Sequence, residues 1–283
     1  MASISLTAQM TTNLLALQNT AKLMGVTQDH LATGKKVNSA IDDPVAFFDA
    51  DAHYQLANDY ATFKNGMSEA IQTIKSATDT IESIKTLLNQ MKSLATSAKS
   101  AATQGDAFAL NAQYADVREQ VDFLAEDAIY KGVNLLKDDT LNVVFNTRGD
   151  DLEVVGFDAR ASGDLALVDA TAAAWGASAA ASGALTTAQL EAISSAVGAI
   201  DDAIAVLRSQ AKTLASNMSI VTTRQDFTDK MIATLKIGGD NLTLADMNEE
   251  GANMLMLQTR QALGIQSLSM ASQSAQQVLQ LFQ

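Results

Sequence analysis

The chain has 283 residues and a formal net charge of −13 at pH 7, which argues against a nucleic-acid or anionic-membrane partner because either would require a basic face. It has no cysteine, which excludes disulfides, thiolate metal sites and a cysteine nucleophile. Its single proline favours long uninterrupted helices, because proline is the strongest helix breaker.

Both ends of the chain are free of charged side chains. No Lys, Arg, Asp or Glu precedes Lys22, and none occurs in residues 261–283. Without a basic stretch before its apolar residues, the N-terminus does not resemble a cleavable secretory signal. An N-terminal heptad seam ends at Gly34 and consists of Met10, Leu14, Leu17, Ala21, Met24, Gln28 and Leu31. We expect these uncharged ends to cover each other and to bind further copies of the chain.

A first rod is predicted from Pro44 to about Thr103. Asp43 can cap its first turn, Pro44 suits the first helical position, and Gly105 provides a stop. Its apolar residues repeat with the 3.5-residue period of a coiled coil. The predicted core positions of this rod include Leu56, Phe63, Ile74, Ile81, Ile84, Leu88 and Met91.

Three shorter elements follow the first rod. A helix is expected from Asp106 to Tyr130, closed by Gly132. The β-branched runs at 141–145 and 152–157 flank a turn around Gly149 and predict a β-hairpin. Residues 169–185 are rich in Ala, Ser and Gly around Trp175, and we expect an exposed connection there.

A second rod of matched length begins at a capping box formed by Thr186 and Gln189, and it is expected to end at Gly238 and Gly239. Its predicted core includes Ile200, Ile204, Leu207 and Leu214, and only Gln225 and Thr228 interrupt the apolar seam. A C-terminal helix is expected to start with Thr243 as its cap. Its apolar stripe is Ile265, Leu268, Ser272, Ala275, Leu279 and Phe282.

The nearly palindromic order of these elements predicts a mainly α fold: a long antiparallel helical rod bundle with terminal coiled-coil helices and a small β-hairpin tip. The domains expected are terminal helices at 1–33 and 244–283, linkers at 34–43 and 236–243, a rod domain at 44–168 and 186–235, and an exposed tip at 169–185.

No catalytic site, cofactor site or metal site is predicted. The chain lacks the motifs of nucleotide-binding loops, zinc proteases and serine hydrolases. The best metal candidate is Asp49, Asp51 and His53, but Asp51 points away from the other two on a helix. A solvated first turn of the rod is therefore the favoured interpretation, and the chain is not expected to be an enzyme.

Three segments resemble bacterial flagellins. Residues 31–44 (LATGKKVNSAIDDP) are similar to a connecting segment of that family, residues 130–136 (YKGVNLL) to the segment before its hairpin, and residues 244–282 to its C-terminal helix. Pro44 with the following Val-Ala-Phe-Phe looks like the alphaproteobacterial form.

The resemblance implies a subunit that self-assembles into the extracellular flagellar filament used for swimming. The terminal helices would form the inner tube (D0) and the rods the outer tube (D1), with no large outer domains. Self-assembly would involve Leu14, Leu17, Met24, Leu31, Ile265, Leu268, Ala275, Leu279 and Phe282. Implied partners are the flagellar type III export apparatus, a flagellin chaperone, and cap and junction proteins.

The resemblance also bears on recognition by hosts. Residues 88–95 are similar to the flagellin segment contacted by the animal Toll-like receptor. Gln90 stands where the family has an arginine, and Gln113 stands where it has a glutamate, which implies weak receptor activation.

Two alternatives remain at the level of sequence. A hook–filament junction protein shares the terminal plan, although the segment 130–136 favours a flagellin. A cytosolic coiled-coil scaffold would normally carry charged e and g positions and charged ends, unlike this chain.

Overall fold

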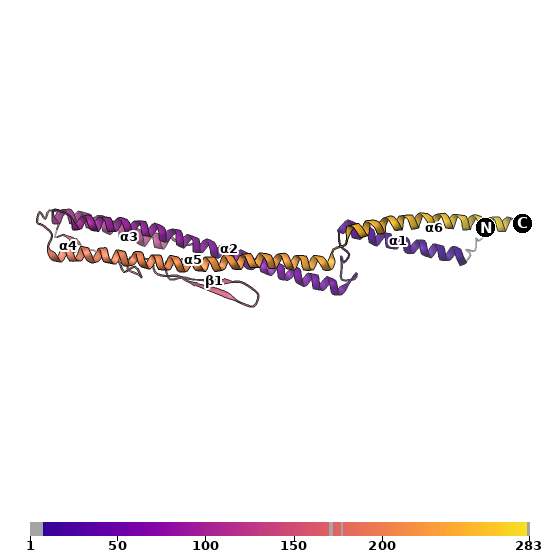
Figure 1. Ribbon diagram of the computed structural model, residues 1–283, viewed down its shortest axis with the longest axis horizontal. Coiled ribbons are helices and arrows are strands. Elements are labelled where there is room, and N and C mark those ends of the chain that lie inside the picture. Colours follow the sequence, from indigo (N-terminus) through magenta and orange to yellow (C-terminus); the bar gives the residue numbers. More distant parts are fainter. Residues whose placement is uncertain (1–7, 170–171, 177, 282–283) are drawn as a thin grey trace. The chain divides into compact units, whose positions relative to one another are not determined.

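The computed structural model describes residues 8–169, 172–176 and 178–281, and the chain divides into two compact units (Figure 1). Unit 1 combines Met1–Ala57 with Ala233–Gln283, and unit 2 is Asn58–Ile232. The elements in chain order are α1 (Ala8–Thr33), α2 (Pro44–Lys99), α3 (Gln104–Asp127), β1 (Thr140–Val144), β2 (Asp151–Val155), α4 (Ala172–Trp175), α5 (Thr187–Thr243) and α6 (Met247–Leu281). The predicted fold class is confirmed: long packed helices, terminal helices in contact and one small antiparallel hairpin.

The core of unit 2 lies between α2, α3 and α5. On α2 and α5 it follows the heptad positions because a 3.5-residue apolar repeat keeps one stripe of each helix facing its neighbours. Of the predicted rod-core residues, those at most 7% exposed are Ile74, Ile81, Ile84, Leu88, Met91, Ile200, Ile204, Leu207 and Leu214. Phe63 is half-buried against a smaller cluster, and Leu56, also half-buried, belongs to unit 1.

Polar residues complete the rod where the second seam loses its apolar character. The side-chain amide of Gln225 donates to the Ser68 hydroxyl of α2 at 2.6 Å, and Thr228 is 2% exposed. A half-buried amide with a partner avoids the desolvation penalty of an unpaired polar group, which explains why the seam tolerates this interruption.

Several predicted helix boundaries are confirmed. The Asp43 carboxylate accepts from the backbone N–H groups of Val45 and Ala46 at 3.0 and 3.1 Å, and Pro44 is the first residue of α2. Gly34 ends α1 with φ +71°. The Thr186 hydroxyl and the Gln189 side chain form the expected reciprocal capping box.

The helix ends predicted at two glycine positions are wrong. Helix α2 ends at Lys99, and Gly105 lies in the first turn of α3, where a Cβ would come within 2.6 Å of the Ala179 carbonyl oxygen. Helix α5 continues through Gly238 and Gly239 to Thr243. In both places the glycine permits another segment to approach closely, so the predicted linker 236–243 is helical.

The cap predicted for the C-terminal helix is also corrected. Thr243 is the last residue of α5, and its hydroxyl donates to the Gly239 carbonyl at 3.1 Å. The Asp246 carboxylate caps α6 instead, accepting from the N–H groups of Asn248 and Glu249 at 2.8 and 3.3 Å.

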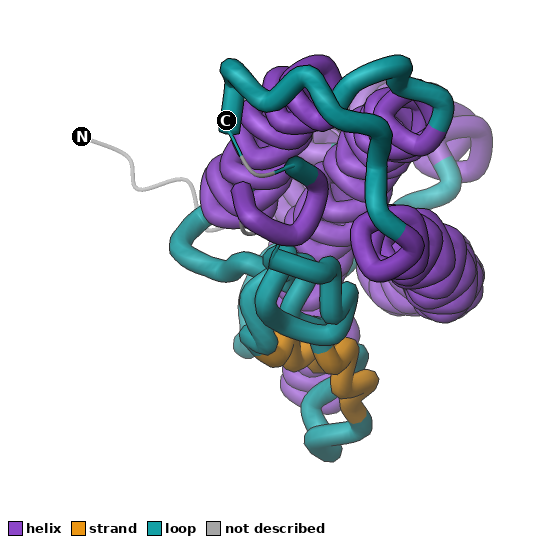
Figure 2. The backbone as a smooth tube through the Cα atoms, turned by 90° about the vertical axis from the view of Figure 1, so that its left-hand side faces the viewer, coloured by secondary structure: helices purple, strands orange, loops and turns teal. Residues whose placement is uncertain are grey.

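The predicted hairpin is present and packs on the rod of unit 2. Strand β1 pairs antiparallel with β2, with Leu141 opposite Val154 and Val143 opposite Leu152. Its inward side chains join Met67 of α2 and Val221 of α5 in the smaller apolar cluster. Viewed along the helices, the strands lie on one side of them (Figure 2).

The segment after the hairpin is anchored by Trp175, although most of the described residues in 169–185 are exposed, as expected. Trp175 is fully buried, and its ring centroid lies 4.9 Å from that of Tyr114 on α3. A large buried aromatic side chain supplies apolar contact that the Ala, Ser and Gly residues around it cannot.

Candidate assembly surface

Helices α1 and α6 form a paired seam within unit 1. On each helix most of the buried and half-buried positions alternate spacings of three and four residues, as in a coiled coil. The positions that follow this spacing are Met10, Asn13, Leu17, Thr20, Met24, Thr27 and Leu31 on α1, and Met254, Leu257, Gln261, Gly264, Leu268 and Ala271 on α6.

The predicted seam of α1 is correct at every second position only. Met10, Leu17, Met24 and Leu31 lie in the pair, whereas Leu14, Ala21 and Gln28 are exposed. The intervening seam positions are the polar Asn13, Thr20 and Thr27, one residue earlier than predicted.

Two contacts fix the register of the α1–α6 pair. A Cβ at Gly264 would lie 2.7 Å from the Leu17 Cδ2 atom, so the absence of a side chain lets the helices approach closely. The His30 Nδ1 atom lies 2.8 Å from the Glu250 Oε1 atom, and both side chains are largely buried. The heptad pattern predicts neither contact, although a glycine within a heptad seam is a signal of close helix packing.

Backbone hydrogen bonds tie together the connections next to this pair. Lys36 N–H donates to the Thr243 carbonyl at 2.8 Å, and Ala245 N–H donates to the Gly34 carbonyl at 3.0 Å. In the same connection, the N–H groups of Asn38 and Ser39 and the Ser39 hydroxyl donate to Asp42 and lower the pKa of its carboxyl group. The N-terminal and C-terminal segments of unit 1 are therefore hydrogen-bonded to each other next to the C-terminal end of α1 and the start of α6.

The outer faces of α1 and α6 expose large apolar side chains. They are Leu14, Leu15, Leu23 and Val26 on α1, and Met247, Leu255, Met256, Leu263, Ile265 and Met270 on α6. Leu263 and Leu255 are 63% and 70% exposed. Large apolar patches on a protein surface mark interaction sites, and these side chains are the candidates for such a site in unit 1.

The predicted self-assembly residues fall into three groups. Leu14 and Ile265 lie on the outer faces, 39% and 57% exposed, whereas Leu17, Met24, Leu31 and Leu268 are half-buried at seam positions. Ala275 and Leu279 belong to α6, but their side chains lie outside the described part of the chain, as does Phe282 altogether.

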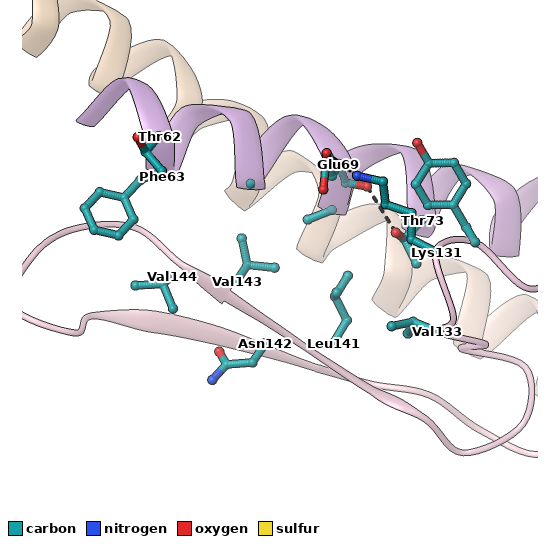
Figure 3. A pocket seen from close by; sticks show the side chains of 13 residues that line it. Thr62, Phe63, Glu69, Thr73, Lys131, Val133, Leu141, Asn142, Val143 and Val144 are labelled. Carbon is teal, nitrogen blue, oxygen red and sulfur yellow. Dashed lines mark hydrogen bonds and ion pairs between the residues drawn. The ribbon is translucent and has the colours of Figure 1, made fainter. Parts of the chain in front are cut away.

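A second surface feature lies in unit 2 between α2 and the hairpin. This groove has a volume of about 420 Å³, and Leu141 and Val143 point from β1 toward α2 (Figure 3). An ion pair between Lys131 and Glu69 spans its edge. The groove contains no histidine and no paired carboxylates, so its described lining offers no acid–base chemistry.

Gln90 on α2 and Gln113 on α3 are both exposed on unit 2. Within the described residues, no three His, Asp or Glu side chains gather in a metal-binding arrangement. No helix in the described ranges is both long and apolar enough to span a membrane.

Residues 4–140 match the bacterial flagellin N-terminal helical region, and residues 197–282 match the bacterial flagellin C-terminal helical region. Flagellin FljO of Caulobacter vibrioides is 30% identical over 273 residues, which cover 95% of each chain. The chain belongs to the bacterial flagellin family. Flagellin A of Rhizobium meliloti strain 1021 is 41% identical over 76 residues, 27% of this chain and 19% of that protein. Both relatives are alphaproteobacterial flagellins, as the sequence predicted.

A solved structure is also similar to this flagellin. The crystal structure of Bacillus cereus flagellin aligns with a TM-score of 0.45 and 16% identity, over 58% of this chain and 88% of that one.

As a flagellin, the chain is a filament subunit of the bacterial flagellum, located in the extracellular filament that serves motility. It is a structural protein without enzymatic activity. The predicted family and function are confirmed, and the flagellin relatives decide against the junction-protein and scaffold alternatives.

Proposed function

We propose that this flagellin polymerises through the outer faces of α1 and α6, which the same helices of neighbouring copies cover. The observation that carries the proposal is the row of exposed apolar side chains on both helices, with Leu255, Leu263 and Ile265 each more than half exposed. Burial of one such side chain stabilises an assembly by about 1.5–3 kcal/mol relative to leaving it in water.

The uncharged ends support the same proposal. Identical helices packed around an axis would place any charge next to its own copies, and desolvating an unpaired charge costs several kcal/mol. Gln, Ser, Thr and Asn provide polarity without that cost. We therefore assign 1–33 and 244–283 to an inner D0 layer and the rods to an outer D1 layer.

Substitution of Leu263 by aspartate tests this proposal. Leu263→Asp should abolish filament formation, or raise the critical concentration at least about tenfold, because burial of the carboxylate opposes assembly. The matched control Leu263→Met keeps an apolar side chain of similar volume and should assemble. Circular dichroism and negative-stain microscopy report folding and filaments respectively, and normal filaments from a folded Leu263→Asp chain would refute the proposal.

The same test applies to Leu14→Asp on α1. Leu268 is a less selective target because it is half-buried at a seam position, where a charge would also disturb the α1–α6 pair. Loss of filaments from both Leu14→Asp and Leu263→Asp would assign assembly to both helices.

We further propose partners and a host response on the basis of family membership. The partners are the flagellar export apparatus, a flagellin chaperone, and cap and junction proteins. Activation of the animal Toll-like receptor is expected to be weak because Gln90 and Gln113 are uncharged. The double variant Gln90→Arg with Gln113→Glu should raise the response of reporter cells, and an unchanged response would contradict the assignment.

A further inference from the structure

A small pocket with aromatic and cationic walls lies beside the hairpin tip in unit 2. Its volume is about 260 Å³, and we call it the arginine pocket. It is lined by Tyr60, Phe145, Asn146, Arg148, Arg224, Phe227, Thr228 and Met231. The guanidinium carbon of Arg224 lies 5.2 Å from the ring centroid of Phe145, and Phe227 is 51% exposed. The pocket therefore offers both an apolar surface and positive charge.

The arginine pocket has two guanidinium groups, those of Arg148 and Arg224, and one neighbouring carboxylate, that of Asp150. Asp150 accepts from the Asn146 amide at 2.6 Å and from Arg148 at 3.4 Å. The Asn146 hydrogen bond, and then the charges of Arg148 and Arg224, lower the pKa of Asp150, which stays ionised at neutral pH. Two guanidinium groups thus face one carboxylate, and one positive charge is left for an incoming anion.

A complementary patch lies on α3, also in unit 2. Asp116, Glu119, Phe123 and Asp127 recur at spacings of three and four residues, which places them on one helix face, and all four are exposed. Phe123 is 49% exposed. No ion pair within the described residues engages these three carboxylates. We call this group the α3 patch.

We propose that the α3 patch of one copy docks into the arginine pocket of the next copy, with Phe123 among the aromatic rings and a flanking carboxylate on the arginines. The occupant is a second copy because this acidic flagellin polymerises, and its α3 patch carries an aromatic side chain for the aromatic walls of the pocket and negative charge for its arginines. The inference rests on the proposed function and adds a contact in unit 2.

The positions of the two surfaces suit an open polymer. In unit 2 the hairpin tip is displaced from α3 along the helices (Figure 1). A contact between two different patches of identical molecules is heterologous, and it continues indefinitely unless a rotation closes it into a ring. Docking of α3 into the pocket of the next copy therefore repeats along a filament.

Cysteine cross-linking tests the contact directly, because the natural chain has no cysteine. Full-length Phe123→Cys and Phe227→Cys chains are mixed with unsubstituted chain, so that filaments form even if either variant assembles poorly. A short bismaleimide is then added to the filaments. Each variant carries one thiol, so a covalent dimer containing both variants reports a contact between copies.

The matched control replaces Phe227→Cys by Ser209→Cys, which is also exposed on α5. We expect mixed dimers from the Phe123 and Phe227 pair at least about fivefold above the control, and Arg224→Glu in the Phe227→Cys chain should remove most of that excess. Filaments with dimers at the control level would overturn the docking contact while assembly through α1 and α6 stands. Failure of unsubstituted chain to form filaments would overturn both.

Discussion

At the scale of single residues, adjacent glycines in α5 have opposite surroundings. A Cβ at Gly239 would meet the Tyr54 ring at 2.8 Å, whereas a Cβ at Gly238 would lie 3.8 Å from the nearest His53 atom, an ordinary contact. The Tyr54 ring is further held by its hydroxyl, which donates to Asp240 at 2.7 Å. Burial and this hydrogen bond raise the pKa of Tyr54.

We therefore predict opposite effects of alanine at the two glycines. Gly239→Ala should destabilise this part of unit 1 by about 1–2 kcal/mol, because overpacking against Tyr54 exceeds the gain in helix propensity. Gly238→Ala should stabilise it by up to about 1 kcal/mol through propensity alone. Hydrogen exchange of the amides of residues 233–243 measures both changes, and equal effects of the two substitutions would contradict the packing explanation.

Tyr114 gives a second prediction at this scale. Burial raises its pKa from 10.0 to about 12, and its hydroxyl is 3.5 Å from the Val168 carbonyl oxygen. The folded state therefore holds the phenol proton to a higher pH than the unfolded state does, so this contribution to stability is fully present below pH 10 and is lost toward pH 12.

The single tryptophan reports this change, because Trp175 packs on Tyr114. We expect the Trp175 fluorescence to change as the pH rises through this range. Tyr114→Phe keeps the ring but removes the ionisable group, and its alkaline transition should be smaller. Identical transitions in the two proteins would show that Tyr114 does not set the alkaline limit of this packing.

At the scale of helices, the start of α6 depends on Asp246. Asp246→Ala removes the acceptor for two backbone N–H groups and should cost about 1 kcal/mol, whereas Asp246→Asn keeps an acceptor and should cost less. Hydrogen exchange at Asn248 and Glu249 measures the loss. Unchanged protection in Asp246→Ala would mean that the helix start is held by other contacts.

The sequence predicts the long helices well because their heptad seams are apolar and continuous. The core positions from Ile74 to Met91 follow the expected spacing, so the 3.5-residue period alone predicts which of these side chains are buried. The hairpin is equally local, since two β-branched runs flank a turn containing Gly149 with φ +86°.

The candidate assembly surface is less predictable from sequence. On α1, Leu14 is the more apolar candidate, yet Asn13 occupies the seam position. A sequence alone cannot tell which apolar face meets the partner helix within the chain and which is left for other copies. The same limit applies to Gly105 and Gly239. Glycine is favoured both at the end of a helix and where another segment packs closely against a helix, and only the position of the neighbouring segment distinguishes the two cases.

At the scale of the whole molecule, assembly brings together copies that each carry a charge of −13. The ion pairs of the described residues neutralise charges within one copy, as Lys92 does with Asp201 at 2.5 Å, so the excess negative charge remains to repel neighbouring copies. The proposed pocket contact offsets one charge, which is small against this total.

Salt should therefore favour polymerisation. The Debye length falls from about 30 Å at 0.01 M salt to about 8 Å at 0.15 M salt. Added salt therefore weakens the repulsion between copies, and it strengthens no contact between charged groups. We expect the critical concentration of seeded filaments, measured by sedimentation, to fall as the salt concentration rises across this range. The apolar faces of α1 and α6 are insensitive to screening, so Leu263→Asp should not regain assembly at 0.15 M salt. A critical concentration that rose with salt would mean that attraction between opposite charges, and not apolar burial, dominates the contacts between copies.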